Sequence, residues 1–448
     1  MSFPKYPKYK DSGVIELGDL PEHWDVKPLK HFAGVDSCGC YGVDAEEGEH
    51  LLPVATTAQI DSDGRFVVPD MPMRGFTLAE IQRYGCGDGD VLVVKSSGSA
   101  TNIISGKAGL VTKDTPLFVF SNFLMRIRPT SDVADSRFVY ALLRSHLTRQ
   151  RVEQMCSTTT YPNLKVSEYT SAPLPLPPLA EQTAIASFLD AETSKIDALI
   201  AEQRRLIELL KEKRQAVISH AVTKGLNPDA PMKASGIEWL GDVPEHWEVT
   251  KVGYVASVAR GTGYQNVQEV DQETDSVQMI RISDFNDFDP IWVSYFATLD
   301  TFKVASTDLL MAGTGASAGI TMRVTEAMAG MIHSYNAPRI RCLNVLPEFL
   351  HFVLNSQSIH HQEDLLFTGS AQHFLDINSI SKLEFAYCSL SEQKQIIDDL
   401  NDKLGELDSL TAEATRAIDL LQERRTALIS AAVTGKIDVR EFASVEAA

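Results

Sequence analysis

Residues 12–24 read SGVIELGDLPEHW, and residues 235–247 repeat this stretch as SGIEWLGDVPEHW. A second motif is also duplicated, because a Glu-Gln dipeptide opens a long apolar-periodic run at 181–182 and another at 392–393. The motifs follow in the same order in both halves, whereas the segments between them differ in length and content. We therefore interpret the 448-residue chain as a duplicated frame that carries two diverged inserts.

The composition predicts a packed cytoplasmic protein. Hydrophobic residues make up 44% of the chain, no apolar run is long enough to span a bilayer, and MSFPKYPKYK at the start is not a signal peptide. The six cysteines do not recur at matching positions in the two copies, as a duplicated disulfide framework or zinc site would. We expect free thiols, no bound metal and a reducing compartment.

The net charge of −19 bears on the partners that the chain can bind. Residues 25–160 hold 14 Lys and Arg against 16 Asp and Glu, and residues 248–371 hold 7 against 14. Neutralisation of phosphates by Lys and Arg supplies most of the nonspecific affinity for DNA. Bulk charge therefore does not favour unaided DNA binding. A DNA-facing surface would have to be locally basic, or partner subunits would have to supply the cations.

Two helical runs are expected at 179–224 and 390–436, each with a heptad pattern of apolar residues. At 1.5 Å per residue each run forms a rod of roughly 60 Å. We expect the rods to pair antiparallel, and the alternative is that each folds onto its own insert. Leu199 and Leu410 lie at equivalent positions and are expected to be buried. The expected seam consists of Ile185, Leu189, Ile196, Leu199, Leu206, Leu210, Val217, Ile396, Leu400, Leu407, Leu410, Leu421 and Leu428.

Each insert is predicted to be mixed α and β, with the same order of elements. In the first insert a buried strand at 89–94 precedes an alternating strand at 123–128 and a helix from Phe138. Residues 308–311 and 339–341 follow the same order in the second. The predicted fold class is therefore mixed α/β, with two related α+β domains and two long antiparallel coiled-coil helices in a pseudo-twofold duplication.

Loops rich in Gly, Ser and Thr follow the first strand of each insert, and a second loop precedes the approach to each long helix. Such loops let a backbone approach a phosphate or a base edge closely, although turns without any ligand have the same composition. Arg281 and Ser283 lie on a neighbouring alternating strand that could face the same groove. The candidate DNA contacts are Lys95, Ser97, Ser99, Thr159, Thr160, Tyr161, Arg281, Ser283, Thr314, Ser317, Arg323, Gln372 and His373.

Motifs for catalysis are incomplete or missing. No Gly-x-x-x-x-Gly-Lys-Ser/Thr loop is present, which excludes a P-loop ATP motor. Residues 289–292 (Asp-Pro-Ile-Trp) lack the second proline of the amino-methyltransferase motif, and Gly261-Thr-Gly263 is only a fragment of a cofactor-binding loop. Neither recurs in the first copy. His23 and His246 are duplicated beside tryptophans and are interpreted as structural. We expect no catalytic site.

The duplicated motifs resemble those of type I restriction–modification specificity subunits. The resemblance rests on LPEHW at 20–24, VPEHW at 243–247, PLPLPPLAEQ at 173–182 and KRQAVISHAVT at 213–223. It covers nearly the whole chain, although the approach to the second helix at 385–393 lacks the prolines of the first. The resemblance implies two target-recognition domains separated by two long antiparallel helices and no catalytic role for this chain.

The same resemblance implies the partners. They are double-stranded DNA with a bipartite site, two modification subunits that methylate adenine, and two restriction subunits. S-adenosylmethionine, ATP and Mg would be bound by those partner subunits, and no cofactor by this chain. The residues alone leave two alternatives open: a coiled-coil scaffold whose inserts bind protein, and a specificity subunit of a methyltransferase-only system.

On this interpretation the chain has seven segments. They are an N-terminal segment with the first LPEHW motif (1–24), a first target-recognition domain (25–178), a central long helix (179–224), a linker with the second VPEHW motif (225–247), a second target-recognition domain (248–389), a distal long helix (390–436) and a C-terminal tail (437–448).

Overall fold

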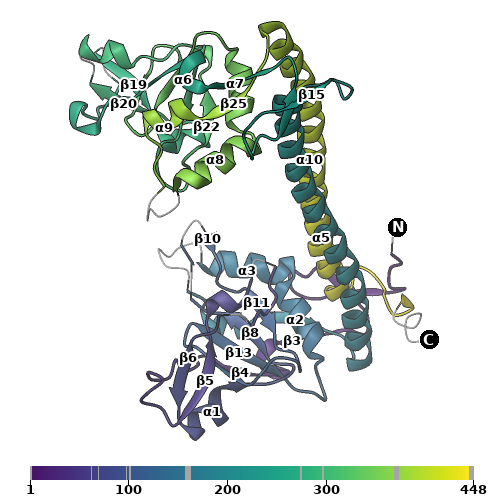
Figure 1. The fold of residues 1–448 in the computed structure, drawn as a ribbon. Coiled ribbons are helices and arrows are strands. Elements are labelled where there is room, and N and C mark those ends of the chain that lie inside the picture. The colour runs from purple at the N-terminus through teal and green to yellow at the C-terminus, as the bar shows by residue number, and fades with distance from the viewer. Residues whose placement is uncertain are drawn as a thin grey trace. The chain divides into compact units, whose positions relative to one another are not determined.

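The computed structural model describes residues 3–442, apart from 62, 69, 97, 100–101, 157–162, 273–274, 295–296 and 368–372. The chain forms two compact units. Unit 1 contains residues 1–203 and 416–448, and unit 2 contains residues 204–415. The two long helices α5 (Leu179–Lys224) and α10 (Leu390–Val433) are both divided between the units, so each unit contains one insert and a section of both helices (Figure 1).

The insert of unit 1 contains two four-stranded sheets. The first has the order β11-β8-β13-β4, with β11 (Ala108–Leu110), β8 (Val91–Val94), β13 (Leu124–Pro129) and β4 (Ala33–Asp36). The second has the order β6-β5-β12-β7, with β6 (Met73–Phe76), β5 (His50–Ala55), β12 (Phe118–Phe120) and β7 (Gly85–Cys86). The insert also contains the pair β9 (Gly98–Ser99) and β10 (Asn102–Ile103), and the helices α1 (Leu78–Tyr84), α2 (Ser136–Arg144), α3 (His146–Cys156) and α4 (Val166–Ser171). All four side chains of β8 are buried, as its uninterrupted apolar sequence predicts.

The insert of unit 2 repeats this architecture. Its four-stranded sheet has the order β18-β24-β21-β22, with β18 (Ala256–Ala259), β24 (Arg339–Cys342), β21 (Asp308–Met311) and β22 (Thr321–Arg323). A three-stranded sheet contains β20 (Ile291–Ser294), β19 (Ser276–Ile280) and β23 (Ile332–His333). The helices are α6 (Val252–Val255), α7 (Pro347–Leu354), α8 (Gln357–Phe367) and α9 (Ile377–Lys382). The prediction that the inserts share an α+β fold is confirmed.

A buried ion pair is also duplicated. Asp90, just before β8, accepts hydrogen bonds from Nε and Nη2 of Arg128, both at 2.6 Å. Asp308, at the start of β21, accepts the same two bonds from Arg341 at 2.8 and 2.7 Å. Both carboxylates are 1% exposed, and a charge is tolerated at such depth when it is paired and hydrogen-bonded. The duplication therefore includes a buried Asp–Arg ion pair in each insert, which comparison of the two sequence copies alone does not show.

The two long helices pack antiparallel within each unit. In unit 2 Arg214 pairs with Asp408, and Gly225 lies beside Glu392. Numbering along one helix therefore rises as it falls along the other. In unit 1 Asp197 pairs with Arg425 at 3.5 Å. None of the helices in the described part of the chain is both long and apolar enough to cross a membrane.

The phase of the seam differs from the expectation at three leucines. Leu199, Leu206 and Leu410 are 45%, 41% and 46% exposed, so the prediction that Leu199 and Leu410 are buried is wrong. Ile200 and Ile218, which lie off the expected seam, are buried instead. The expected seam residues that are buried are Ile185, Leu189, Ile196, Ile396, Leu400, Leu407, Leu210 and Leu428, whereas Val217 and Leu421 are half-buried.

The physical reason lies in the angular spacing of a helix. A step of four residues from Ile196 rotates by about 40°, and a step of three rotates by about 60° in the opposite sense. Both steps reach an apolar residue, Ile200 or Leu199, so the sequence pattern fits either phase. Packing selects Ile200, which joins the same core cluster as Leu428 and Ile429 of α10.

The two duplicated motifs contact one another at the start of each long helix. In unit 1 the buried Glu181 carboxylate accepts hydrogen bonds from Tyr6 Oη (2.5 Å) and Trp24 Nε1 (3.1 Å), and it lies 2.7 Å from His23 Nε2. In unit 2 Glu392 lies 3.1 Å from His246 Nε2. The glutamate of each Glu-Gln dipeptide therefore joins the Pro-Glu-His-Trp hairpin to the helix.

The glutamine of each dipeptide ties the helix to the insert. Gln182 accepts from the backbone N–H of Asp135 (2.9 Å) at the N-terminus of α2. Gln393 accepts from the backbone N–H of Leu346 (2.9 Å) at the N-terminus of α7. Both glutamines are fully buried, and a buried amide requires such partners. Short strands complete the frame: β1 (Tyr9–Asp11) with β2 (Asp19–Pro21), β3 (Asp25–Pro28) with β14 (Pro173–Leu176), β15 (Met232–Ala234) with β16 (Asp242–Pro244), and β17 (Glu248–Lys251) with β25 (Glu384–Tyr387).

Candidate nucleic-acid interface

The small-residue loops of each insert pair with the loops that precede the long helices. In unit 2 the Gly313 N–H donates to Asn336 O, and Gly313 O accepts from the Leu375 N–H, both at 2.8 Å. In unit 1 the Lys95 N–H donates to Phe123 O, and Lys95 O accepts from the Leu164 N–H, again at 2.8 Å. The two loops that the sequence singled out in each insert therefore meet at the end of its central strand.

A third loop joins each cluster and explains two glycines. A Cβ on Gly39 would lie 1.9 Å from Phe120 O, and one on Gly261 would lie 2.1 Å from His333 O. Only glycine allows this backbone approach. The Gly261-Thr-Gly263 fragment is thus explained by loop packing. We define loop cluster 1 as residues 37–41, 95–96, 121–123 and 163, and loop cluster 2 as residues 260–264, 313–317, 334–336 and 373–375.

Loop cluster 2 exposes a cation among aromatic rings. The Arg260 guanidinium lies 4.8 Å from the Tyr335 ring centroid and 5.9 Å from that of Phe374, and it contacts the Tyr335 hydroxyl. The two rings are 41% and 48% exposed. Within the described residues, no carboxylate forms an ion pair with Arg260. Arg260 contributes, as the smallest cause, to a lowered pKa of the Asp376 carboxyl, which the backbone N–H of Ser379 mainly causes.

Loop cluster 1 has a different set of exposed groups. Lys95 Nζ donates to Ser37 O at 3.2 Å, while Phe123 is 51% exposed and Asn163 is exposed. The Cys40 thiol has a pKa raised mainly by burial, so it is a weak nucleophile. The described part of the chain contains no group of three or more His, Cys, Asp or Glu residues that could hold a metal ion.

The structure divides the predicted DNA contacts into three groups. Lys95, Thr314, Ser317 and His373 belong to the loop clusters. Ser97, Thr159, Thr160, Tyr161 and Gln372 lie outside the described residues, and Ser99 is described only as backbone of β9. The third group contacts carboxylates through ion pairs or a hydrogen bond, and it consists of Arg281, Ser283 and Arg323.

These three residues make local contacts. Arg281 pairs with Asp284 at 2.9 Å, and Ser283 Oγ donates to the same carboxylate at 3.2 Å. Arg323 pairs with Glu348 at 3.1 Å. A neighbouring carboxylate offsets each arginine's charge, which distinguishes these arginines from Lys95 and Arg260.

Sequence reasoning missed Arg260, Tyr335, Phe374, Phe123 and Asn163. These residues come from loops that are distant in sequence, and no motif marks them. Alignment of the two duplicated motifs places Ser37 opposite Arg260, so comparison of the two copies was the one available signal.

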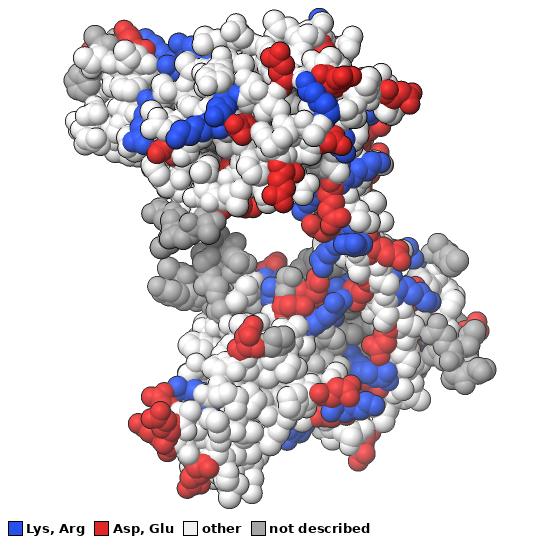
Figure 2. Space-filling model, viewed as in Figure 1, with Lys and Arg blue, Asp and Glu red and all other residues white. Residues whose placement is uncertain are grey.

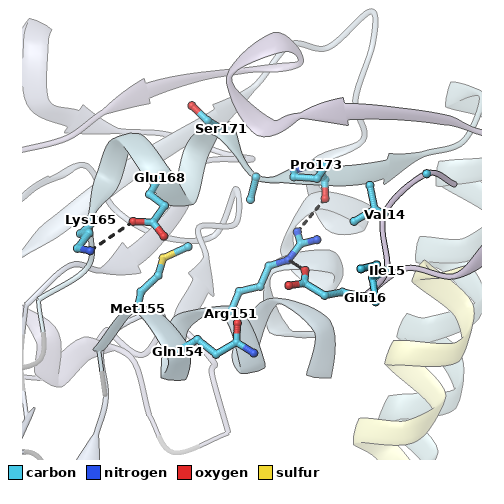
Figure 3. Close-up of a pocket in the computed structure, with 12 residues that line it drawn as sticks. Val14, Ile15, Glu16, Arg151, Gln154, Met155, Lys165, Glu168, Ser171 and Pro173 are labelled. Atoms are coloured by element: carbon cyan, nitrogen blue, oxygen red, sulfur yellow. Dashed lines mark hydrogen bonds and ion pairs between the residues drawn. The ribbon is translucent and has the colours of Figure 1, made fainter. Parts of the chain in front are cut away.

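A further cavity lies elsewhere in unit 1. It has a volume of about 840 Å³ and is bordered by the turn at 13–16, α3 and α4 (Figure 3). Its charges are satisfied internally, because Arg151 pairs with Glu16 at 2.5 Å and Lys165 with Glu168 at 3.6 Å. On the molecular face drawn in Figure 2, acidic and basic side chains are interspersed. Because both cations of the cavity are paired with carboxylates, the cavity is not a cationic site.

Comparison with known proteins shows which family the chain resembles. Residues 21–209 match the family model described as type I restriction modification DNA specificity domain. A solved chain from a type I R-M system study has a TM-score of 0.68 with 16% identity, covering 92% of this chain and 98% of its own length, which shows a shared fold.

Curated relatives extend the match to nearly the whole chain. The type I restriction enzyme EcoBI specificity subunit of Escherichia coli is 24% identical over 331 residues, covering 70% of this chain and 68% of its own length. The MjaVIII specificity subunit of Methanocaldococcus jannaschii is 21% identical over 457 residues, with 97% and 98% covered. The chain is therefore similar to type I restriction–modification specificity subunits along nearly its whole length.

Proposed function

We propose that this chain selects the DNA sites of a type I restriction–modification complex, with each unit reading one half of a bipartite site in double-stranded DNA. The supporting observation is the equivalence of the two loop clusters. Both lie at the same end of the central strand, β8 or β21, and both are held by equivalent backbone hydrogen bonds. Their side chains differ, as two readers of different half-sites require.

The loop clusters suit recognition of base edges. Phosphate contacts position a protein on DNA, while side chains that reach the grooves read the sequence. Each cluster combines close-packed backbone with a few exposed polar and aromatic groups. In this mechanism the chain holds and orients DNA and performs no bond-breaking step.

Catalysis would belong to the partners. Two modification subunits would bind S-adenosylmethionine and methylate adenine, and two restriction subunits would use ATP and Mg to cleave unmodified DNA. The net charge of −19 supports phosphate contacts that are shared with the partners, because the 60 Asp and Glu residues of this chain outnumber its 41 Lys and Arg residues. Partner subunits would supply them.

The test is an exchange of inserts, followed by sequencing of methylated bases in a host that contains no other DNA-modification system. Residues 25–160 are replaced by the corresponding insert of another family member, and the complex is assembled with its modification subunit. One half of the methylated motif should change and the other should stay. A change in both halves, or in neither, contradicts modular reading. Absence of any sequence-dependent methylation by the unaltered complex favours a protein-binding scaffold.

A further inference from the structure

Equivalent positions in the two loop clusters are fixed by strand register and backbone hydrogen bonds. Asp36 pairs with Arg126 in unit 1 as Ala259 pairs with Arg339 in unit 2, so the next residues, Ser37 and Arg260, are equivalent.

The loop hydrogen bonds extend the equivalence. Phe123 O and Asn336 O accept from Lys95 and Gly313, respectively. The residues just before Leu164 and Leu375 are likewise equivalent, namely Asn163 and Phe374. Ser96 forms a bridge with Asn163, and Thr314 forms one with Phe374, which supports the same register.

With this register, the two clusters contain the same three kinds of side chain at exchanged positions. Phenyl stands at 123 and carboxamide at 163 in cluster 1, whereas carboxamide stands at 336 and phenyl at 374 in cluster 2. The cation comes from Lys95 in cluster 1 and from Arg260 in cluster 2. Because Lys95 Nζ lies 3.2 Å from Ser37 O, the ammonium reaches the residue that is equivalent to Arg260.

Core packing does not explain this exchange. Phe123 and Phe374 are 51% and 48% exposed, so neither ring fills a core. In the described residues neither Lys95 nor Arg260 forms an ion pair, unlike Arg128 and Arg341, which hold buried carboxylates. Both clusters keep a cation, an exposed phenyl ring and a carboxamide, although the ring and the carboxamide exchange positions. We expect this where two surfaces bind a ligand of the same chemical class.

We propose that these three groups are the specificity-determining residues of each unit: Lys95, Phe123 and Asn163 in unit 1, and Arg260, Asn336 and Phe374 in unit 2. This rests on the proposed function, since the ligand is taken to be DNA. In the major groove a cation reads guanine O6 and N7, a carboxamide reads adenine N6 and N7, and an apolar group contacts the thymine methyl.

The two units are expected to differ in how strongly they discriminate guanine from other bases. The planar Arg260 guanidinium lies over the Tyr335 ring and can present two parallel N–H groups to guanine. Lys95 presents a flexible point charge. Unit 2 should therefore discriminate guanine from other bases more strongly than unit 1 does.

The experiment uses the full chain assembled with its modification subunit, and it reads methylated motifs by genome-wide sequencing. In Arg260→Gln, the new amide favours adenine, so one position in one half-site should change from guanine to adenine or lose its preference. Methylation of the original site should fall roughly tenfold or more. Arg260→Lys should keep the position with weaker discrimination, and Lys95→Gln should alter the other half-site.

Lys251→Gln is the matched control. Lys251 lies in β17 of unit 2 and pairs with Glu384 at 3.5 Å, outside loop cluster 2. It loses one charge as Arg260→Gln does, and its motif should be unchanged.

The outcomes separate this inference from the function on which it rests. If the unaltered complex recognises no bipartite motif, both are overturned. If it recognises one, and Arg260→Gln and Lys95→Gln leave motif and rate as they were, only the inference is overturned. A loss that is equal on all sequences, with a shallower salt dependence, would make these cations phosphate contacts and would also overturn it.

Discussion

The contact between the duplicated motifs makes an asymmetric prediction about stability. Glu181 is 7% exposed and accepts from Tyr6 and Trp24, whereas among the described residues Glu392 has only the exposed His246 as a side-chain partner. The pKa of the Tyr6 hydroxyl is raised by burial and by its hydrogen bond to Glu181, so the hydroxyl stays protonated and donates.

Glu181→Ala would leave two buried donors without an acceptor. Each orphaned donor costs about 1–3 kcal/mol, so we expect a loss of about 3 kcal/mol in the free energy of unfolding of unit 1. In unit 2 the Trp247 indole N–H already has no partner among the described residues, so Glu392→Ala should cost about 1 kcal/mol or less. Glu181→Gln, which keeps one acceptor oxygen, should fall between the two.

Hydrogen exchange followed by mass spectrometry is the suitable assay, because a chain with two units does not have to unfold in one step. The backbone amides of β2 and of β16 report the two hairpins separately. Faster exchange should be confined to β2 in Glu181→Ala. Equal effects of the two alanine variants, or a larger effect of Glu392→Ala, would refute the reasoning.

Three further outcomes are expected. Ile200→Asp should destabilise unit 1 by several kcal/mol in urea unfolding while Leu199→Asp is nearly neutral, because only Ile200 is buried; the reverse ranking would restore the original seam. Gly435→Ala should cost more than Gly225→Ala in thermal unfolding: both have positive φ, but a Cβ at Gly435 would lie 2.4 Å from a Pro21 side-chain atom; equal costs would contradict this. Burial lowers the pKa of His333 to about 4, so between pH 6.5 and pH 4 the unfolded state binds more protons than the folded state. The free energy of unfolding should therefore decrease as the pH is lowered from about 6.5 to about 4. A His333→Gln variant whose free energy of unfolding depends on pH as strongly as that of the unaltered chain would contradict this role of His333.

The duplicated architecture could be predicted from the sequence because its signals are local and repeated. Two long apolar-periodic runs mark helices regardless of their surroundings, and the hairpin and Glu-Gln motifs recur in one order. The buried strands β8 and β21 could also be predicted, because a short apolar run that is flanked by turn residues is typical of a buried strand.

Packing alone decided the phase of the helical seam and the composition of the loop clusters. Ile200 and Leu199 are equally apolar, so only contact with α10 distinguishes them. Arg260, Tyr335 and Phe374 are brought together by strand register and loop hydrogen bonds between residues far apart in sequence, and no local pattern records such contacts. The sequence by itself therefore determined the duplicated frame, while tertiary structure determined which exposed side chains it gathers into each loop cluster.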